Sequence, residues 1–361
     1  MGIGSRCTAP SKPVTIAERL CSAAAAAGAQ AEQALSGAVF EGFANVWTPL
    51  MAARRLGSRP VRVELAGEAV VLFRGRDGSP SALIDRCPHR GAALSLGRID
   101  AEGRIECPYH GWRFDGSGTN CLTPLNPEAR RERLGATPLP VQQVGDLLWV
   151  YTAPGVKAPR DPVASEGLTD PDLTRVYLER HWACHWTRAM ENMLDSPHLP
   201  FVHRRTIGRP LRRIMRPQSS MQVSWEETDW GGRARASIDG GDNRATLEFH
   251  RPNMMALTIP IPGRRLQIHA LVIPVDAAGT RLIVAGSRDF LRLRLLNPLF
   301  SWINGRIADE DKPVVESTRP SEIPQPDEEH SLGSDQATLQ FRRYYYRSLR
   351  PFAAAPPGEP A

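Results

Sequence analysis

The sequence lacks a long apolar segment. No run of about eighteen uninterrupted apolar residues occurs in it, and the apolar stretch 295–307 is broken by asparagine, proline and arginine. A helix that crosses a bilayer needs about 20 predominantly apolar residues. The sequence therefore predicts no membrane span.

Cysteines and nucleotide-binding glycine motifs are also scarce. The six cysteines are spread over 361 residues, a density far below that of small secreted disulfide frameworks, which favours a reducing compartment such as the cytoplasm. No G-x-G-x-x-G segment follows a predicted strand, so the chain is not expected to bind NADH or NADPH itself. Electrons from such a donor would have to arrive through another protein.

The charge is moderately basic, with a net charge of +6, and arginines are crowded into residues 203–216. No helix-turn-helix, zinc-finger or aromatic stacking motif accompanies them, which disfavours nucleic-acid binding. Two interpretations stay open. The arginines form a docking surface for an acidic electron donor or another subunit, or they are solvated surface residues, which is the simpler reading.

The length of the chain and a proline-rich stretch near its middle predict two domains. Short strands separated by turns dominate the first half, and a proline-rich stretch after residue 152 stops any long helix or central strand. We expect a mobile leader, an all-β domain, a linker, an α+β domain and a disordered tail. Their ranges are 1–39, 40–152, 153–172, 173–350 and 351–361. Strands in the first domain are expected at 61–65, 69–74, 81–86, 104–106, 112–114 and 147–151.

The second domain alternates between helix and sheet. A helix is expected near 187–194 and another from about residue 300, with an antiparallel sheet between them. This order predicts an α+β fold in which the sheet wraps around helices, a helix-grip-like arrangement. The expected strands are 176–186, 219–227, 244–250, 265–274 and 281–287.

The most specific motif consists of two mixed cysteine and histidine pairs. C-P-H at 87–89 is followed, after seventeen residues, by C-P-Y-H at 107–110. Two thiolates on one iron and two imidazoles on the other form a Rieske [2Fe-2S] centre. A zinc site uses the same atoms, but zinc fingers bring separate cysteine and histidine pairs. The spacing therefore favours four cluster ligands, Cys87, His89, Cys107 and His110.

A second motif lies in the other domain. Asn192, Asp195, His198 and His203 form the pattern N-x-x-D-x-x-H-x4-H. Two histidines five positions apart lie about 140° apart on a straight helix, but Pro197 and Pro200 interrupt the helix and can turn His203 back toward His198. Asp195, one turn before His198, is placed to orient that imidazole. The pattern is compatible with a metal site, although the spacing alone does not establish one.

Two histidines and a carboxylate form the facial triad that binds ferrous iron and leaves positions open for O2. The candidate carboxylate lies in 303–316, where Ile303, Ile307 and Val315 recur at four-residue steps and Asp311 interrupts the apolar stripe. A carboxylate on an inward face must be paired or metal-bound. Asp309 is the alternative ligand, although both it and Glu310 point to other sides of the helix.

The chain resembles the Rieske non-heme iron oxygenases. C-P-H-R-G at 87–91 and C-P-Y-H-G-W at 107–112 are similar to the Rieske signature of that family. N-x-x-D-x-x-H-x4-H resembles its mononuclear iron motif, and E-D-x-x-V-x-E at 310–316 resembles the context of its carboxylate ligand. Within the family the chain is most similar to stand-alone catalytic subunits such as vanillate demethylase, chlorophyllide a oxygenase and 3-ketosteroid hydroxylase.

The resemblance implies the cofactors and partners. An N-terminal Rieske domain would hold the [2Fe-2S] cluster, and His198, His203 and Asp311 in the catalytic domain would hold a mononuclear Fe(II), with O2 as cosubstrate. Electrons from NAD(P)H would come through a separate reductase, with or without a ferredoxin. The family also implies a head-to-tail homotrimer in which Asp195 links His198 to the cluster histidines of the adjacent subunit, and catalytic roles for Asp195 and Asn192.

The activity expected from this resemblance is hydroxylation or oxidative demethylation of an aromatic, alicyclic or natural-product-like molecule. The alternatives are arene cis-dihydroxylation, a Rieske electron carrier with a non-catalytic C-terminal domain, and a regulatory or structural Rieske protein. The apolar run 254–261 could line the substrate pocket or pack in the core. Four histidines are expected in the core, in a pocket or on the surface rather than on a metal: His181, His185, His250 and His269.

Overall fold

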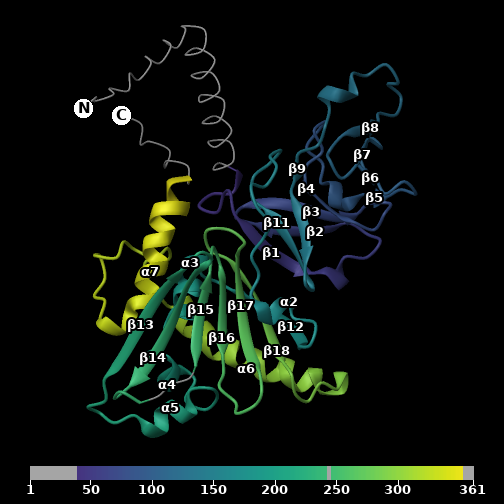
Figure 1. The fold of residues 1–361 in the computed structure, drawn as a ribbon. Helices are drawn as coiled ribbons and strands as arrows, with labels where there is room; N and C mark the ends of the chain where they lie inside the picture. The colour runs from purple at the N-terminus through teal and green to yellow at the C-terminus, as the bar shows by residue number, and fades with distance from the viewer. Residues whose placement is uncertain (1–38, 242–244, 353–361) are drawn as a thin grey trace, which may run out of the picture.

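The computed structural model describes residues 39–241 and 245–352. The expected leader lies outside the described residues except for Val39, and the expected tail lies outside them except for its first two residues. Two modules of different architecture follow one another along the described chain (Figure 1). Among the helices of this part, none is both long and apolar enough to cross a membrane.

The first module consists of short antiparallel strands in three small sheets, with strand orders β1-β11-β10, β2-β3-β4-β9 and β5-β6-β7-β8. Apolar residues explain the strands, since the middle of β3, 70–73, is fully buried. A tight turn at Ala66 and Gly67, both with positive φ, joins β2 to β3. The strands are β1 Trp47–Ala52, β2 Val61–Leu65, β3 Glu68–Arg74, β4 Pro80–Ile84, β5 Arg98–Ile99, β6 Ile105–Glu106, β7 Arg113–Phe114, β8 Asn120–Leu122, β9 Pro138–Leu139, β10 Val141–Val144 and β11 Leu147–Tyr151.

The second module is one seven-stranded antiparallel sheet with helices packed on it, which confirms the predicted α+β class. The strand order is β12-β18-β17-β16-β15-β14-β13. Helix α3 packs against β15, β16 and β17, α6 against β12 and β18, and α7 against β13 and α3 (Figure 1). The strands are β12 Thr174–Trp182, β13 Met221–Thr228, β14 Gly231–Ile238, β15 Thr246–His250, β16 Met254–Thr258, β17 Leu266–Pro274 and β18 Thr280–Arg288. The helices are α2 Glu166–Thr169, α3 Trp186–Leu194, α4 Leu199–Val202, α5 Arg209–Ile214, α6 Asn297–Glu316 and α7 Gln336–Tyr344.

Two strands of the large sheet were not predicted from the sequence. β14 begins with two glycines, which have low strand propensity, and the ring of Trp225 occupies the space that a side chain at Gly232 would need. β16 lies inside the apolar run 254–261, where Met254, Met255 and Ala256 are all buried. A strand buried on both faces shows no alternation, so its period cannot be recognised in the sequence.

The expected strand 176–186 is shorter than predicted. β12 ends at Trp182, and the chain then leaves the sheet before α3 begins. His185 therefore does not lie on a strand, and its side chain caps α3 by accepting a hydrogen bond from the Thr187 N–H. The expected strand 176–186 would have carried both His181 and His185, but only His181 lies on β12.

A shared apolar core joins the modules. Buried residues of β1 and β11 belong to the same cluster as those of β17, β18 and α3. Across this contact the Asn253 side-chain amide donates to the hydroxyl of Thr48 at 2.9 Å, and the N–H of Ala66 donates to the carbonyl of Pro274 at 2.9 Å. The part of the first module that carries the cysteine motif has a smaller core of its own, which includes Cys87, Cys107 and Trp112.

Candidate metal centres

Two loops with the same backbone geometry carry the four predicted cluster ligands. In each loop the cysteine N–H donates to the carbonyl five residues later, at 2.8 Å in both, and a glycine N–H donates back to the cysteine carbonyl, at 2.9 and 3.0 Å. Those glycines, Gly91 and Gly111, have φ of 73° and 70°, a conformation that other residues rarely adopt. The turns themselves therefore require glycine.

The loops bring two thiols and two imidazoles together. The ring centroids of His89 and His110 are 4.5 Å apart, and His89 stacks on Trp112 at 4.6 Å. Cys87 and Cys107 are each only 2% exposed, whereas His110 is exposed. The four side chains thus form a site with a buried sulfur end and an open imidazole end.

The donor set fits a cluster. Burial, together with the neighbouring thiol of Cys107, raises the pKa of Cys87 to about 11, so a thiolate at this position needs a cation to stabilise it. The Nδ1 atom of His89 is buried and has no hydrogen-bond partner among the described residues. A bound iron–sulfur group would satisfy both requirements.

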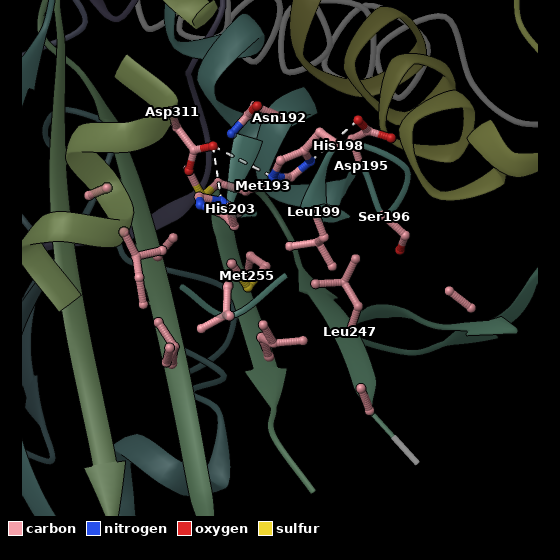
Figure 2. A pocket seen from close by; sticks show the side chains of 18 of the residues that line it. Asn192, Met193, Asp195, Ser196, His198, Leu199, His203, Leu247, Met255 and Asp311 are labelled. Atoms are coloured by element: carbon pink, nitrogen blue, oxygen red, sulfur yellow. Dashed lines mark ion pairs between the residues drawn. The ribbon is translucent and has the colours of Figure 1, made fainter. Parts of the chain in front are cut away.

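A second set of donors comes from the segment around α4 and from α6. His198 immediately precedes α4, and His203 immediately follows it. This four-residue helix has a proline in its first turn. The turn that it makes places the two imidazole ring centroids 5.1 Å apart. The structure thus brings both histidines to one point, as Figure 2 shows.

Asp311 of α6 completes this set. Its Oδ1 atom lies 3.1 Å from Nε2 of His203 and 3.5 Å from Nε2 of His198, and ligand atoms of all three residues lie within 4.8 Å of one another. Both ring nitrogens of His198 and Oδ1 of Asp311 are buried without a hydrogen bond among the described residues. Unsatisfied buried polar atoms are costly, and a divalent cation would satisfy them. The donors therefore fit the two-histidine, one-carboxylate iron site.

A carboxylate lies behind each imidazole. Nδ1 of His198 is 3.3 Å from the carboxylate of Asp195, and Nδ1 of His203 is 2.9 Å from the carboxylate of Glu310, which also accepts a hydrogen bond from Thr206 at 2.6 Å. Burial lowers the pKa of His203, but the hydrogen bonds and charges of Asp311 and Glu310 outweigh it and raise the pKa. Carboxylates in this position fix the ring so that Nε2 points at the metal.

Glu310 is the residue that the sequence analysis missed. It does leave α6 on a different side from Asp311, but it meets His203 there instead of pointing away from the site. Asp309 points elsewhere, as predicted, and pairs with Arg180 at 2.7 Å. The stripe prediction was wrong for Ile303, which is 38% exposed because this part of α6 is not covered by the rest of the chain.

The two residues predicted to be catalytic lie beside the metal donors (Figure 2). Asn192 on α3 lines the same cavity, and its amide nitrogen is buried with no hydrogen-bond partner in the described part of the chain. The side chain of Asp195, just after α3, is 29% exposed and lies 3.3 Å from Nδ1 of His198. Both positions suit residues that act next to a metal ion.

The cavity beside these donors is narrow, about 90 Å³, and mostly apolar. Met255 and Leu257 from the apolar run 254–261 line it, whereas Met254 packs in the core. His250 stacks on Trp230 at 4.1 Å, and His269 pairs with Ser165 at 3.1 Å. Neither histidine belongs to the metal-donor group.

The fold and the two centres define a protein with an iron–sulfur type ligand set in a small β module and a facial triad in a larger sheet module. Two family models match these modules. The Rieske [2Fe-2S] domain matches residues 46–141, and the vanillate O-demethylase oxygenase C-terminal domain matches residues 182–350. The chain therefore combines a Rieske [2Fe-2S] domain with the C-terminal domain of the vanillate O-demethylase oxygenases, and is similar to Rieske oxygenases.

Curated relatives agree with this assignment. The chain is 33% identical over 308 residues to chlorophyllide a oxygenase of Chlamydomonas reinhardtii, covering 76% of this chain and 43% of that protein. It is 28% identical over 310 residues to methylxanthine N3-demethylase NdmB of Pseudomonas putida, covering 81% and 84%. The chain spans about half the length of the chlorophyllide and pheophorbide a oxygenases that it matches.

Solved structures share the fold. Pseudomonas putida CBB5 NdmB has a TM-score of 0.71 at 26% identity, over 83% of this chain and 89% of that one. Dicamba monooxygenase bound to dicamba has a TM-score of 0.69 at 22% identity, over 84% and 96%. The arrangement of the two modules is therefore that of known Rieske oxygenases.

Proposed function

We propose that this protein uses O2 and electrons from NADH or NADPH, delivered by a separate reductase, to hydroxylate or oxidatively demethylate a small organic molecule. The observation that carries this proposal is the convergence of His198, His203 and Asp311 within 4.8 Å of one another beside an apolar cavity. Two relatives are named as demethylases, NdmB and dicamba O-demethylase. Their names favour demethylation or monooxygenation over arene dihydroxylation.

In this proposal the triad would hold a ferrous ion, and the loops of the first module would hold a [2Fe-2S] cluster through Cys87, His89, Cys107 and His110. Ferrous iron in such a site supplies O2 activation, and the cluster supplies single electrons. The protein itself provides the surroundings. Glu310 accepts a hydrogen bond from Nδ1 of His203, and the carboxylate of Asp195 lies 3.3 Å from Nδ1 of His198, so each would help direct Nε2 toward the metal position.

The cavity provides the second part of the mechanism. Its apolar walls exclude water from the space next to the triad, which protects a reactive centre and strengthens the electrostatic interactions inside it. Asn192 offers its amide at the metal end, where it can position O2 or substrate by hydrogen bonding. Substrate would be held against the triad by shape and hydrophobic contact.

The proposed assembly is a head-to-tail homotrimer in the cytoplasm, with a reductase and, where needed, a ferredoxin as electron donors. The exposed imidazole end of the cluster site and the partly exposed carboxylate of Asp195 support it, because both are open to a neighbouring molecule. Asp195 would then connect His198 to His110 or His89 of the adjacent subunit. The domain limits 40–152 and 173–350, with a linker between them, belong to the same proposal.

Counting iron tests the proposal. An oxygenase should contain about three irons per chain, an electron carrier about two and a zinc protein none. His198→Ala and Asp311→Ala should each lower the count by about one while the cluster's visible absorption persists. A wild-type protein that binds only two irons after anaerobic reconstitution, or that shows no reductase-dependent O2 uptake with any substrate, would contradict the assignment.

A further inference from the structure

The cavity wall away from the metal donors is almost entirely apolar. Strands β13 to β18 contribute only alanine, valine, leucine, isoleucine and methionine to it, within the residues that the structure describes. The polar lining residues of α3 and of the following segment, Asn192, Asp195 and Ser196, are close in sequence to His198 and lie at the metal end (Figure 2). This leaves one polar side chain on the remaining wall, Asn304 of α6.

The wall also lacks a cation. No lysine or arginine lines the cavity in the described ranges 39–241 and 245–352, while Asp195 and Asp311 do. On the wall away from the triad and its ferrous ion, a carboxylate or phosphate would be desolvated with no basic side chain beside it. The cavity therefore selects against anionic molecules.

Asn304 is placed for binding a ligand. Its side chain belongs to a residue that is only 6% exposed, yet within the described part of the molecule it has no hydrogen-bond partner. Its amide atoms are not among the fully buried ones, so they are open to the cavity and available to a ligand or water. Nothing in the packing of α6 requires an amide here, because its cavity-facing neighbours Ile307 and Ala308 are apolar.

The sheet makes room for this amide. Leu282, Val284 and position 286 lie at two-residue steps on one face of β18, and position 286 is a glycine. A Cβ atom at Gly286 would lie 2.4 Å from the amide nitrogen of Asn304. The missing side chain at position 286 thus gives the amide the space that it occupies.

Resting on the proposed function, we infer that the substrate is an uncharged, largely apolar molecule with one carbonyl or hydroxyl group, and that Asn304 binds this group. Asn304 and Asp311 are seven residues apart on one helix, about 10 Å along its axis. Hydrogen bonding at Asn304 would fix one end of the molecule and set which carbon lies at the triad. Asn304 is therefore a specificity-determining residue.

A substrate that reaches from Asn304 to the triad needs more room than the present cavity of about 90 Å³. Met193, Met221 and Met255 lie in the lining, and the unbranched methionine side chain changes rotamer at low cost. Rearrangement of these residues would widen the cavity without moving the backbone. Asn304 and the metal donors, on the rigid helix α6 and around α4, would keep their places.

The test is a binding experiment with three probes of one shape: 2-acetylnaphthalene, its hydrocarbon counterpart 2-isopropylnaphthalene, and the anion 2-naphthoate. Dissociation constants are measured on the iron-loaded protein by quenching of naphthalene fluorescence. The ratio of ketone to hydrocarbon affinity should fall about five-fold in Asn304→Leu, which keeps the volume but removes the hydrogen bond. Naphthoate should bind more weakly than the ketone in the wild type.

Two further variants keep the test specific. Gly286→Ala displaces the amide without removing it and should lower the same ratio, whereas Ile303→Val, on the exposed side of α6 and outside the cavity lining, should leave it unchanged. An unchanged ratio in Asn304→Leu, or naphthoate binding as tight as ketone binding, overturns the inference. Iron counting on the same samples separates the two proposals, since about three irons with an unchanged ratio removes only the role of Asn304.

Discussion

Glu310 gives the sharpest test of how the protein holds its mononuclear iron. Its carboxylate lies 2.9 Å from Nδ1 of His203 and accepts a second hydrogen bond from Thr206 at 2.6 Å. Glu310→Gln keeps the length and the hydrogen-bonding capacity of the side chain but removes the charge. We expect iron affinity at the triad to fall about 10- to 100-fold, the usual effect of losing such a partner.

The energy of the contact gives the lower end of this range. A hydrogen bond to a charged group contributes about 1.5–3 kcal/mol and a neutral one about 0.5–1.5 kcal/mol, so loss of the charge costs about 1–1.5 kcal/mol, and each 1.4 kcal/mol corresponds to about a factor of 10. The contact with His203 is well buried, because the side chains of His203 and Glu310 are 2% and 21% exposed. Solvent screening should therefore weaken it only partly.

The neighbouring residue provides a matched control. Asp309 precedes Glu310 on the same helix, but it pairs with Arg180 on the surface, where the two side chains are 51% and 35% exposed. Exposed pairs contribute about 0–1 kcal/mol, so Asp309→Asn should leave iron affinity unchanged. The assay is competition with a ferrous chelator, followed by metal analysis, with the absorption of the [2Fe-2S] cluster as an internal reference. Equal iron affinity in wild type and Glu310→Gln, or equal losses in both variants, would refute the reasoning.

Four further outcomes follow from the structure. Asp195→Ala should retain both metals yet stop turnover, measured as product formation with a reductase; normal turnover would remove the bridging role. Cys107→Ala should lose the cluster absorption while the chelator titration still finds the mononuclear iron; loss of both metals would contradict two separately held centres. Trp186→Ala should destabilise the protein by about 3–5 kcal/mol in denaturant unfolding, because the ring packs edge-on against Phe43, Phe341 and Tyr345. Burial lowers the pKa of His269 to about 4, below its unfolded value of about 6.5, so stability should decline as pH falls from about 6.5 to 4, and His269→Gln should flatten that decline.

The sequence was most informative where chemistry demands a fixed set of residue types. His198 and His203 were recognisable chiefly because their motif resembles the mononuclear iron motif of the Rieske oxygenases, and Asp311 because it interrupts an apolar stripe in a sequence context similar to that family's. The structure brings these three together. Their roles as iron ligands rest on this geometry and on the experiments above.

The sequence was least informative where two distant segments meet. A helical wheel gives the direction in which the Glu310 side chain leaves α6, but it does not show that His203 lies in that direction. Ile303 fits the apolar period and is still exposed, because the period of a helix does not tell how far its partner surface extends. Nothing in the sequence indicates that Gly286 and Asn304 are related. Their contact becomes visible only where β18 packs against α6.

The apolar core that runs from β1 and β11 into β17 and α3 has a practical consequence for anyone who cuts this protein into pieces. Severing the chain in its proline-rich stretch would leave Trp47, Leu50 and Trp149 on one fragment and Trp186 and Leu271 on the other, each stripped of part of its cover. Exposed apolar surfaces of this kind promote aggregation and binding to other molecules. The two halves are therefore best produced together, as one polypeptide.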